Sequence, residues 1–121
     1  MKSTQQAYIW GHAGNGRLGL GACERIGAPE KERFFFPIPT PIMTLEPVRL
    51  LSCGADHTLA YGASGVWSWG SGAGGKLGLG DEKDRSTPCL IGKLKNRSVS
   101  MIVASTWHSM ALAIHPPMVH T

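Results

Sequence analysis

The 121 residues include 42% hydrophobic side chains and carry a net charge of +4, which suits one globular domain or a part of a larger one. This balance excludes a highly charged disordered chain. Sixteen glycines, eight prolines and four tryptophans are more than a helical protein of this size usually contains. The composition therefore predicts an all-β fold of short strands and turns, with almost no helix.

The N-terminal extension, residues 1–6, is followed by only four apolar or aromatic residues before Gly11. That stretch is too short for the apolar core of a signal peptide. No run approaches the roughly 18 apolar residues needed to cross a bilayer. We therefore expect a soluble protein of the cytoplasm or nucleus that has no membrane partner.

A glycine-rich segment occurs twice in the chain. Residues 8–21 read YIWGHAGNGRLGLG and residues 67–80 read WSWGSGAGGKLGLG, an alignment that places Trp10 over Trp69 without a gap. We expect a strand that ends at each Trp-Gly, followed by a long turn. The glycines allow positive φ and close approach of the backbone in this turn, while the leucines place apolar side chains between strands.

The second copy of this segment also matches two phosphate-binding motifs. Gly70, Gly75 and Lys76 have the spacing of a P-loop, and a G-x-G-x-x-G pattern overlaps them. A P-loop needs Ser or Thr after its lysine, where this chain has Leu77. Both motifs need a following helix, which the next glycines disfavour. We therefore expect no nucleotide and no other cofactor, and we interpret Lys76 as a loop residue.

An insertion follows the first glycine-rich segment. Each copy passes through Thr-Pro, at residues 40–41 and 87–88. The distance from the end of the glycine-rich segment to Thr-Pro is longer in the first copy than in the second. The difference predicts twelve extra residues in the first copy, within residues 22–39. Three consecutive phenylalanines cannot all be buried on one face of a strand. We predict that they pack on a neighbouring sheet or form a partner contact, whose residues would be Arg33, Phe34, Phe35 and Phe36.

A second segment is also repeated. Residues 48–61 read VRLLSCGADHTLAY and residues 99–112 read VSMIVASTWHSMAL, an alignment that pairs His57 with His108. Large and small side chains alternate from residue 108 to residue 114, as in a strand. Tight turns at residues 53–56 and 104–107 then make each copy an antiparallel meander. A repeated histidine at the start of an inner strand favours a structural hydrogen bond over a catalytic role.

The residue types of a metal or catalytic site lack the spacing that such a site requires. The three cysteines show no C-x-x-C pattern, and none of His12, His115 and His120 has metal-ligand spacing with a cysteine. No G-x-S-x-G motif is present, and no pair of glutamates is positioned by periodicity. We expect no metal and no enzymatic activity.

The basic run at residues 93–97 reads KLKNR and has two interpretations. It is either a solvated turn or a weak contact for nucleic acid or an acidic partner. No aromatic residue lies within the run, so stacking on bases is not supported. We expect no nucleic-acid partner.

Taken in order, the chain shows Trp-Gly, a glycine-rich loop, Leu-Gly-Leu-Gly, Thr-Pro, a strand, a turn, His and a strand, and then Trp-Gly again. This order resembles the regulator-of-chromosome-condensation repeat family. The resemblance implies about two four-stranded antiparallel blades of a β-propeller that normally has seven. The first repeat would cover residues 7–65, the second residues 66–114, and residues 115–121 would form a tail. The residues expected to define the repeat structurally are Trp10, Gly11, Leu18, Gly19, Gly21, His57, Trp69, Gly70, Leu77, Gly78, Gly80 and His108.

The resemblance also implies a function. It predicts a protein-protein interaction module that is a fragment or subunit of a larger scaffold or regulatory protein. Further blades would come from the same parent chain or from other subunits. The namesake of the family is a guanine-nucleotide exchange factor for the small GTPase Ran and also binds nucleosomes, so regulation of a Ran-type small GTPase is the alternative. No exchange-specific loop can be matched in this sequence.

Overall fold

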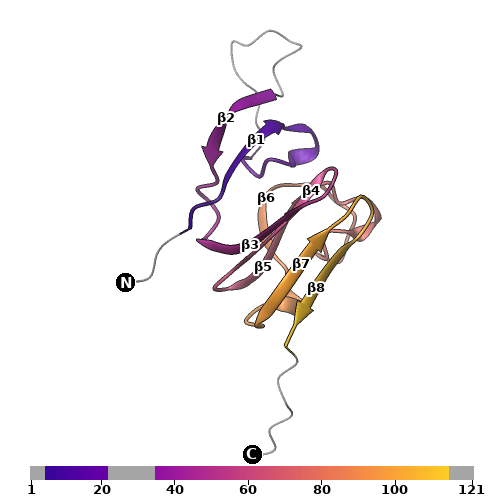
Figure 1. The fold of residues 1–121 in the computed structure, drawn as a ribbon. Helices are drawn as coiled ribbons and strands as arrows, with labels where there is room; N and C mark the ends of the chain where they lie inside the picture. The colour runs from indigo at the N-terminus through magenta and orange to yellow at the C-terminus, as the bar shows by residue number, and fades with distance from the viewer. Residues whose placement is uncertain (1–4, 22–34, 115–121) are drawn as a thin grey trace, which may run out of the picture.

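The computed structural model describes residues 5–21 and 35–114 (Figure 1). Eight strands form three antiparallel sheets, which confirms the all-β prediction. The only helical elements in these ranges are three short 3₁₀ turns: η1 (Gly14–Gly16), η3 (Ala73–Gly75) and η4 (Gly92–Leu94). Within the described residues no helix is long and apolar enough to span a bilayer.

The central sheet is one complete blade. It contains β3 (Val48–Cys53), β4 (His57–Gly62), β5 (Gly65–Gly70) and β6 (Arg85–Leu90), hydrogen-bonded in that order. Its first two strands come from the first predicted repeat, while its fourth strand and nearly all of its third come from the second. The structural blade is therefore out of phase with the repeat in the sequence.

The other two sheets are half blades on either side of the complete one (Figure 1). One pairs β1 (Tyr8–His12) with β2 (Phe35–Pro41), and the other pairs β7 (Val99–Ala104) with β8 (Ser109–Ala113). The β7–β8 register repeats that of β3–β4 residue for residue, including the position of the bulge. The two predicted blades are thus realised as one complete blade, an outer half and an inner half.

The strand register corrects the alignment of the insertion. Thr40 pairs with Ile9 in the half blade, whereas Cys89 pairs with Ser68 in the complete blade. Because Ile9 and Ser68 are equivalent in the two copies, Thr40 corresponds to Cys89 and not to Thr87, and the first copy carries ten extra residues. The prediction of twelve, based on aligning the Thr-Pro dipeptides, was wrong. A shift of two positions keeps every side chain on its face, so alternation could not reveal it.

Two buried clusters hold the three sheets together. The first joins β1 and the segment after β2 to the central blade, and the second joins the central blade to β7. The first cluster consists of Ala7, Ile42, Leu45, Val48, Ala60 and Trp69. The second consists of Leu59, Val66, Ile91, Val99, Ile102 and Ala104.

The basic run forms η4 and the turn after it. Lys93 and Lys95 are exposed, whereas Leu94 packs against the second cluster. Asn96 adopts φ of 60°, a left-handed conformation that asparagine tolerates better than most residues. These features fit a solvated turn, and a ligand contact of the basic run stays a prediction.

Candidate functional site

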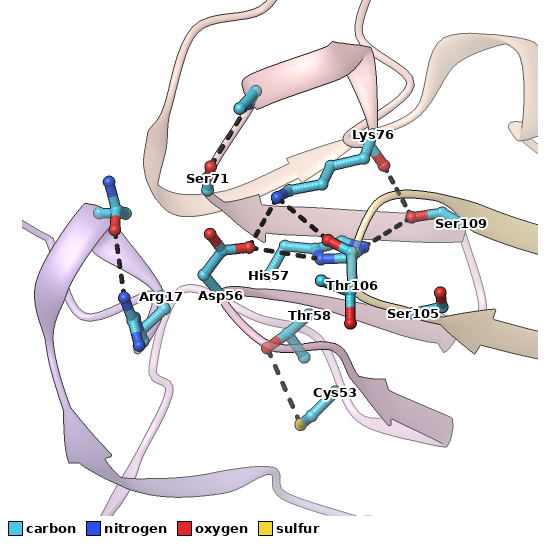
Figure 2. A network of polar contacts seen from close by, with 12 residues as sticks. Arg17, Cys53, Asp56, His57, Thr58, Ser71, Lys76, Ser105, Thr106 and Ser109 are labelled. Carbon is cyan, nitrogen blue, oxygen red and sulfur yellow. Dashed lines mark hydrogen bonds and ion pairs between the residues drawn. The ribbon is translucent and has the colours of Figure 1, made fainter.

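A network of polar side chains lies at one end of the central blade (Figure 2). There the β3–β4 turn, the β7–β8 turn and the second glycine-rich loop meet. Nζ of Lys76 lies 2.7 Å from Oδ1 of Asp56, and the two side chains are 1% and 30% exposed. The same ammonium donates a hydrogen bond to the carbonyl oxygen of Thr106 at 3.5 Å. Lys76 therefore connects the glycine-rich loop to both turns.

His57 connects the network to β8. Its Nε2 lies 2.8 Å from Oγ of Ser109, and that hydroxyl donates to the carbonyl oxygen of Lys76 at 2.7 Å. Because the single hydroxyl proton goes to Lys76, Nε2 of His57 must be the donor to Ser109. Nδ1 is then unprotonated and lies 4.0 Å from Asp56.

The charge states in the network follow from burial and from the lysine. Burial, followed by the positive charge of Lys76, lowers the pKa of His57, so the imidazole is neutral at neutral pH. The hydrogen bond from Lys76 lowers the pKa of Asp56, an effect that its charge reinforces. The cluster thus holds a neutral histidine beside an ion pair.

Ser109, His57 and Asp56 occur in the order of a catalytic triad, but their protons are arranged differently. In a triad, Nε2 accepts the serine proton and Nδ1 donates to the aspartate. Here Nε2 donates, and Nδ1 faces the aspartate without a proton. This geometry does not support nucleophilic catalysis. The contacts instead support the structural role of His57, which stays a prediction.

Trp107 is the exposed end of this site. Its ring centroid lies 5.8 Å from Nζ of Lys76, within cation–π range, and the residue is 76% exposed. The adjacent residue, Thr106, accepts the hydrogen bond from the same lysine. The β7–β8 turn therefore presents an indole to solvent beside the ion pair of Lys76 and Asp56.

The nearest hollow is small. A cavity of about 200 Å³ lies between β1 and the β3–β4 turn, and its lining includes Trp10, Arg17 and Asp56. Sites for small molecules usually enclose roughly 300–1,000 Å³. Among the described residues no cluster of His, Cys, Asp and Glu has the arrangement of a metal site. The arrangement suits contact with a macromolecule better than capture of a small ligand.

The two tryptophans of the repeat have different environments. Trp69 is 0% exposed, and its Nε1 donates to the carbonyl oxygen of Arg17 at 3.1 Å. Trp10 is 57% exposed. Leu18 and Leu77 are both buried. Positive φ values, between 68° and 117°, occur at all six repeat-defining glycines: Gly11, Gly19, Gly21, Gly70, Gly78 and Gly80.

The phenylalanine segment lies only partly within the described residues. Phe35 is half exposed and meets His12 edge to face, with the ring centroids 4.8 Å apart. Phe36 is partly buried opposite Gly11. Arg33 and Phe34 lie outside the described residues, and the partner contact stays a prediction. His108 is exposed in the β7–β8 turn, with Nδ1 3.5 Å from Oγ of Ser105.

Sequence reasoning missed the ion pair and the exposed indole. The prediction treats Lys76 as an ordinary loop residue, although Arg17 at the equivalent position is a signal that a cation is required there. Trp107 occupies the place in the β7–β8 turn that Asp56 occupies in the β3–β4 turn. Comparison of the two turns could have identified this place as one where the copies differ in chemistry.

Comparisons with known proteins agree with the geometry. The family model described as the Regulator of chromosome condensation (RCC1) repeat matches residues 6–61 and 64–112. The chain is 38% identical over 115 residues to the human Regulator of chromosome condensation, a match that covers 93% of the chain and 25% of that protein. It is 37% identical over 109 residues to the Ultraviolet-B receptor UVR8 of Arabidopsis thaliana, covering 87% of the chain and 22% of the receptor.

Solved structures show the same fold. The crystal structure of Prp20p from Saccharomyces cerevisiae matches with a TM-score of 0.72 at 17% identity, covering 94% of this chain and 28% of that one. Human WBSCR16 matches with a TM-score of 0.75 at 20% identity, covering 93% of this chain and 31% of that one. The chain spans about a quarter of the length of these relatives. Its two matched repeats and its blade register show that it belongs to the regulator-of-chromosome-condensation repeat family.

Proposed function

We propose that the chain is a protein-protein interaction module and a fragment or subunit of a larger scaffold or regulatory protein. The observation that carries this proposal is Trp107, an exposed indole on a turn that Lys76 and its ion pair hold in place. Tryptophans in ordered surroundings are over-represented among residues that dominate protein interfaces. Phe35, half exposed in β2, is a second proposed contact. The proposed location is the cytoplasm or the nucleus.

The structure of Prp20p was described together with its binding to Gsp1p and histones, so these two proteins are the natural probes. Binding of each probe to the immobilised chain is measured by biolayer interferometry. We expect Trp107→Ala to weaken binding about tenfold without lowering the melting temperature. Met43→Ala, which truncates another exposed apolar side chain far along the sequence, is the matched control. Equal affinities for wild type and Trp107→Ala would contradict the proposal.

Nucleotide exchange on a Ran-type small GTPase is a second candidate function. It is favoured by the 38% identity to the human Regulator of chromosome condensation. The test is the release of a fluorescent GDP analogue from a Ran-type small GTPase with and without the chain. Faster release would assign exchange activity to these two repeats. Binding with unchanged release would leave the chain an interaction module alone.

A further inference from the structure

The two Thr-Pro dipeptides of the chain lie in different places of the fold. Thr40 lies within the ladder of β1 and β2, where it pairs with Ile9 and its hydroxyl donates to the carbonyl oxygen of Ile38 at 2.9 Å. Thr87 lies in a β-bulge of β6, because residues 86–88 together oppose a single residue of β5. A bulge leaves residues out of the ladder and can redirect a side chain. Only one of the two dipeptides is therefore presented outside the regular ladder.

The hydroxyl of Thr87 is accessible. Thr87 is exposed, whereas Thr40 is half-buried. Oγ1 of Thr87 has no hydrogen-bond partner among the described residues, and the carbonyl oxygen of the same residue accepts from Sγ of Cys89 at 3.4 Å. The neighbouring Ser86 lies against the first glycine-rich loop, where its carbonyl oxygen accepts from the backbone N–H of Gly21 at 2.8 Å. Thr87 is thus the hydroxyl of this segment that a second protein can reach.

Neighbouring blades leave this position of the outer strand open to solvent. Thr87 is exposed although the loop of the preceding half blade lies beside its bulge, at Gly16 and Ser86. In the alignment that pairs Thr40 with Cys89, the equivalent of Thr87 is Ile38, in the bulge of β2. Ile38 is 72% exposed although the complete blade follows its half blade (Figure 1). The position therefore stays accessible with a neighbour on either side, as in a larger propeller.

Pro88 gives Thr87 the backbone that a protein kinase binds. A residue before proline is restricted to extended conformations, and proline has no N–H for the kinase to satisfy. We propose that Thr87 is a phosphorylation site for a proline-directed serine/threonine kinase. The γ-phosphoryl group of ATP passes to Oγ1 of Thr87, its bond to the bridging oxygen of ADP breaks, and the hydroxyl proton goes to the catalytic aspartate of the kinase.

A phosphate on Thr87 changes the charge of the outer strand beside an existing ion pair. Nη2 of Arg85 lies 2.8 Å from Oδ2 of Asp81, and the two side chains are 27% and 35% exposed. A phosphate adds about −1.5 to −2 charges at pH 7 and forms strong charge-assisted hydrogen bonds with arginine. Arg85, two residues before Thr87, can pair with this phosphate in place of Asp81. The modification is a charge switch that does not depend on the proposed partner surface around Trp107.

Phosphorylation of the chain in vitro tests the proposal. The 121-residue chain is incubated with ATP and a mitogen-activated protein kinase, and the modified residue is identified by tandem mass spectrometry. We expect phosphate on Thr87 and none at that position in Thr87→Val, which keeps the shape of the side chain. Thr40→Val is the matched control and should be phosphorylated as fast as wild type. An unmodified Thr87 would overturn the proposal.

Two synthetic peptides, residues 35–45 and 82–92, separate the effect of the fold from that of the local sequence. Each peptide contains one Thr-Pro without the sheet around it. The preference for Thr87 over Thr40 should be about tenfold or more greater in the chain than between the peptides, because Thr40 reacts only after its ladder opens. An equal preference in the chain and the peptides would mean that the kinase acts on unfolded chains, which would overturn the assignment.

Two further variants identify what the kinase recognises. Pro88→Ala should lower the initial rate of phosphorylation of Thr87 about tenfold or more, because it restores an N–H and frees the backbone of Thr87. Trp107→Ala, which removes the proposed partner contact, should leave the rate unchanged. An undiminished rate in Pro88→Ala would overturn the assignment to a proline-directed kinase, whether or not the Trp107 surface binds a partner.

Discussion

Trp69 and Trp10 occupy the same place in two copies of one repeat, yet one is fully buried and the other is mostly exposed. Trp69 lies over the glycine-rich loop that precedes it, and its indole nitrogen has a partner there. Trp10 stands at the edge of a half blade. Both copies of the repeat thus provide a tryptophan at this position. How much that tryptophan contributes to the free energy of unfolding depends on whether a neighbouring loop buries it.

The largest effect that this comparison predicts is on the tryptophans themselves. Trp69→Ala should lower the free energy of unfolding by about 3–5 kcal/mol, because it empties the centre of the first cluster. Trp10→Ala should cost less than about 1 kcal/mol in dilute solution, because its ring is already hydrated. Urea unfolding of both variants measures the difference. Similar losses would show that the half blade is packed as tightly as the complete one.

The glycine-rich loops sharpen the comparison. Gly16 and Gly75 have φ of 71° and 75°, so alanine is strained at both, by about 1–2 kcal/mol. Only Gly16 also faces backbone, at Ser86. Gly16→Ala should therefore destabilise the chain by at least about 1 kcal/mol more than Gly75→Ala. Chemical denaturation of the two variants isolates the contact from the conformational strain, and equal losses would leave strain as the whole effect.

The ion pair between Lys76 and Asp56 should contribute to stability mainly because the ammonium of Lys76 is buried. Asp56→Asn leaves the ammonium of Lys76 without its counter-charge, and we expect a loss of about 1–3 kcal/mol. Lys76→Met should cost less, since the carboxylate that it leaves is partly hydrated. The double variant should be more stable than Asp56→Asn alone. A double-mutant cycle from thermal unfolding tests this, and additive losses would argue against the pairing.

The smallest predicted effect is on pH dependence. Because folding lowers the pKa of His57 below its ordinary value of 6.5, the unfolded chain binds more protons just below that pH. The contribution of neutral His57 to stability is thus present above its ordinary pKa and is lost as the pH falls below it. His57→Gln should flatten this dependence between about pH 7.5 and pH 5.5, as followed by urea unfolding. An unchanged slope would place its origin at another group.

Much of the fold could be predicted from residues alone. Alternation in residues 108–114 and the two Trp-Gly segments indicated strands, turns and a repeated meander. The register of β2 could not be predicted, because a shift of two positions leaves every face unchanged. The candidate site was predicted least well, since Asp56, Lys76 and Thr106 meet only when three loops converge.

The sequence by itself determined the local structure. Its glycines permit the positive φ values of the loops, and its alternating side chains select strands. Only the tertiary structure decided which copy of each feature is buried. Burial depends on a neighbouring blade, so similar segments acquire different environments: Trp69 is buried in the core, whereas Trp10 remains exposed. Tertiary structure likewise decided the environment of Lys76. Folding buries its side chain and places Asp56 within 2.7 Å, so that the buried ammonium has a counter-charge.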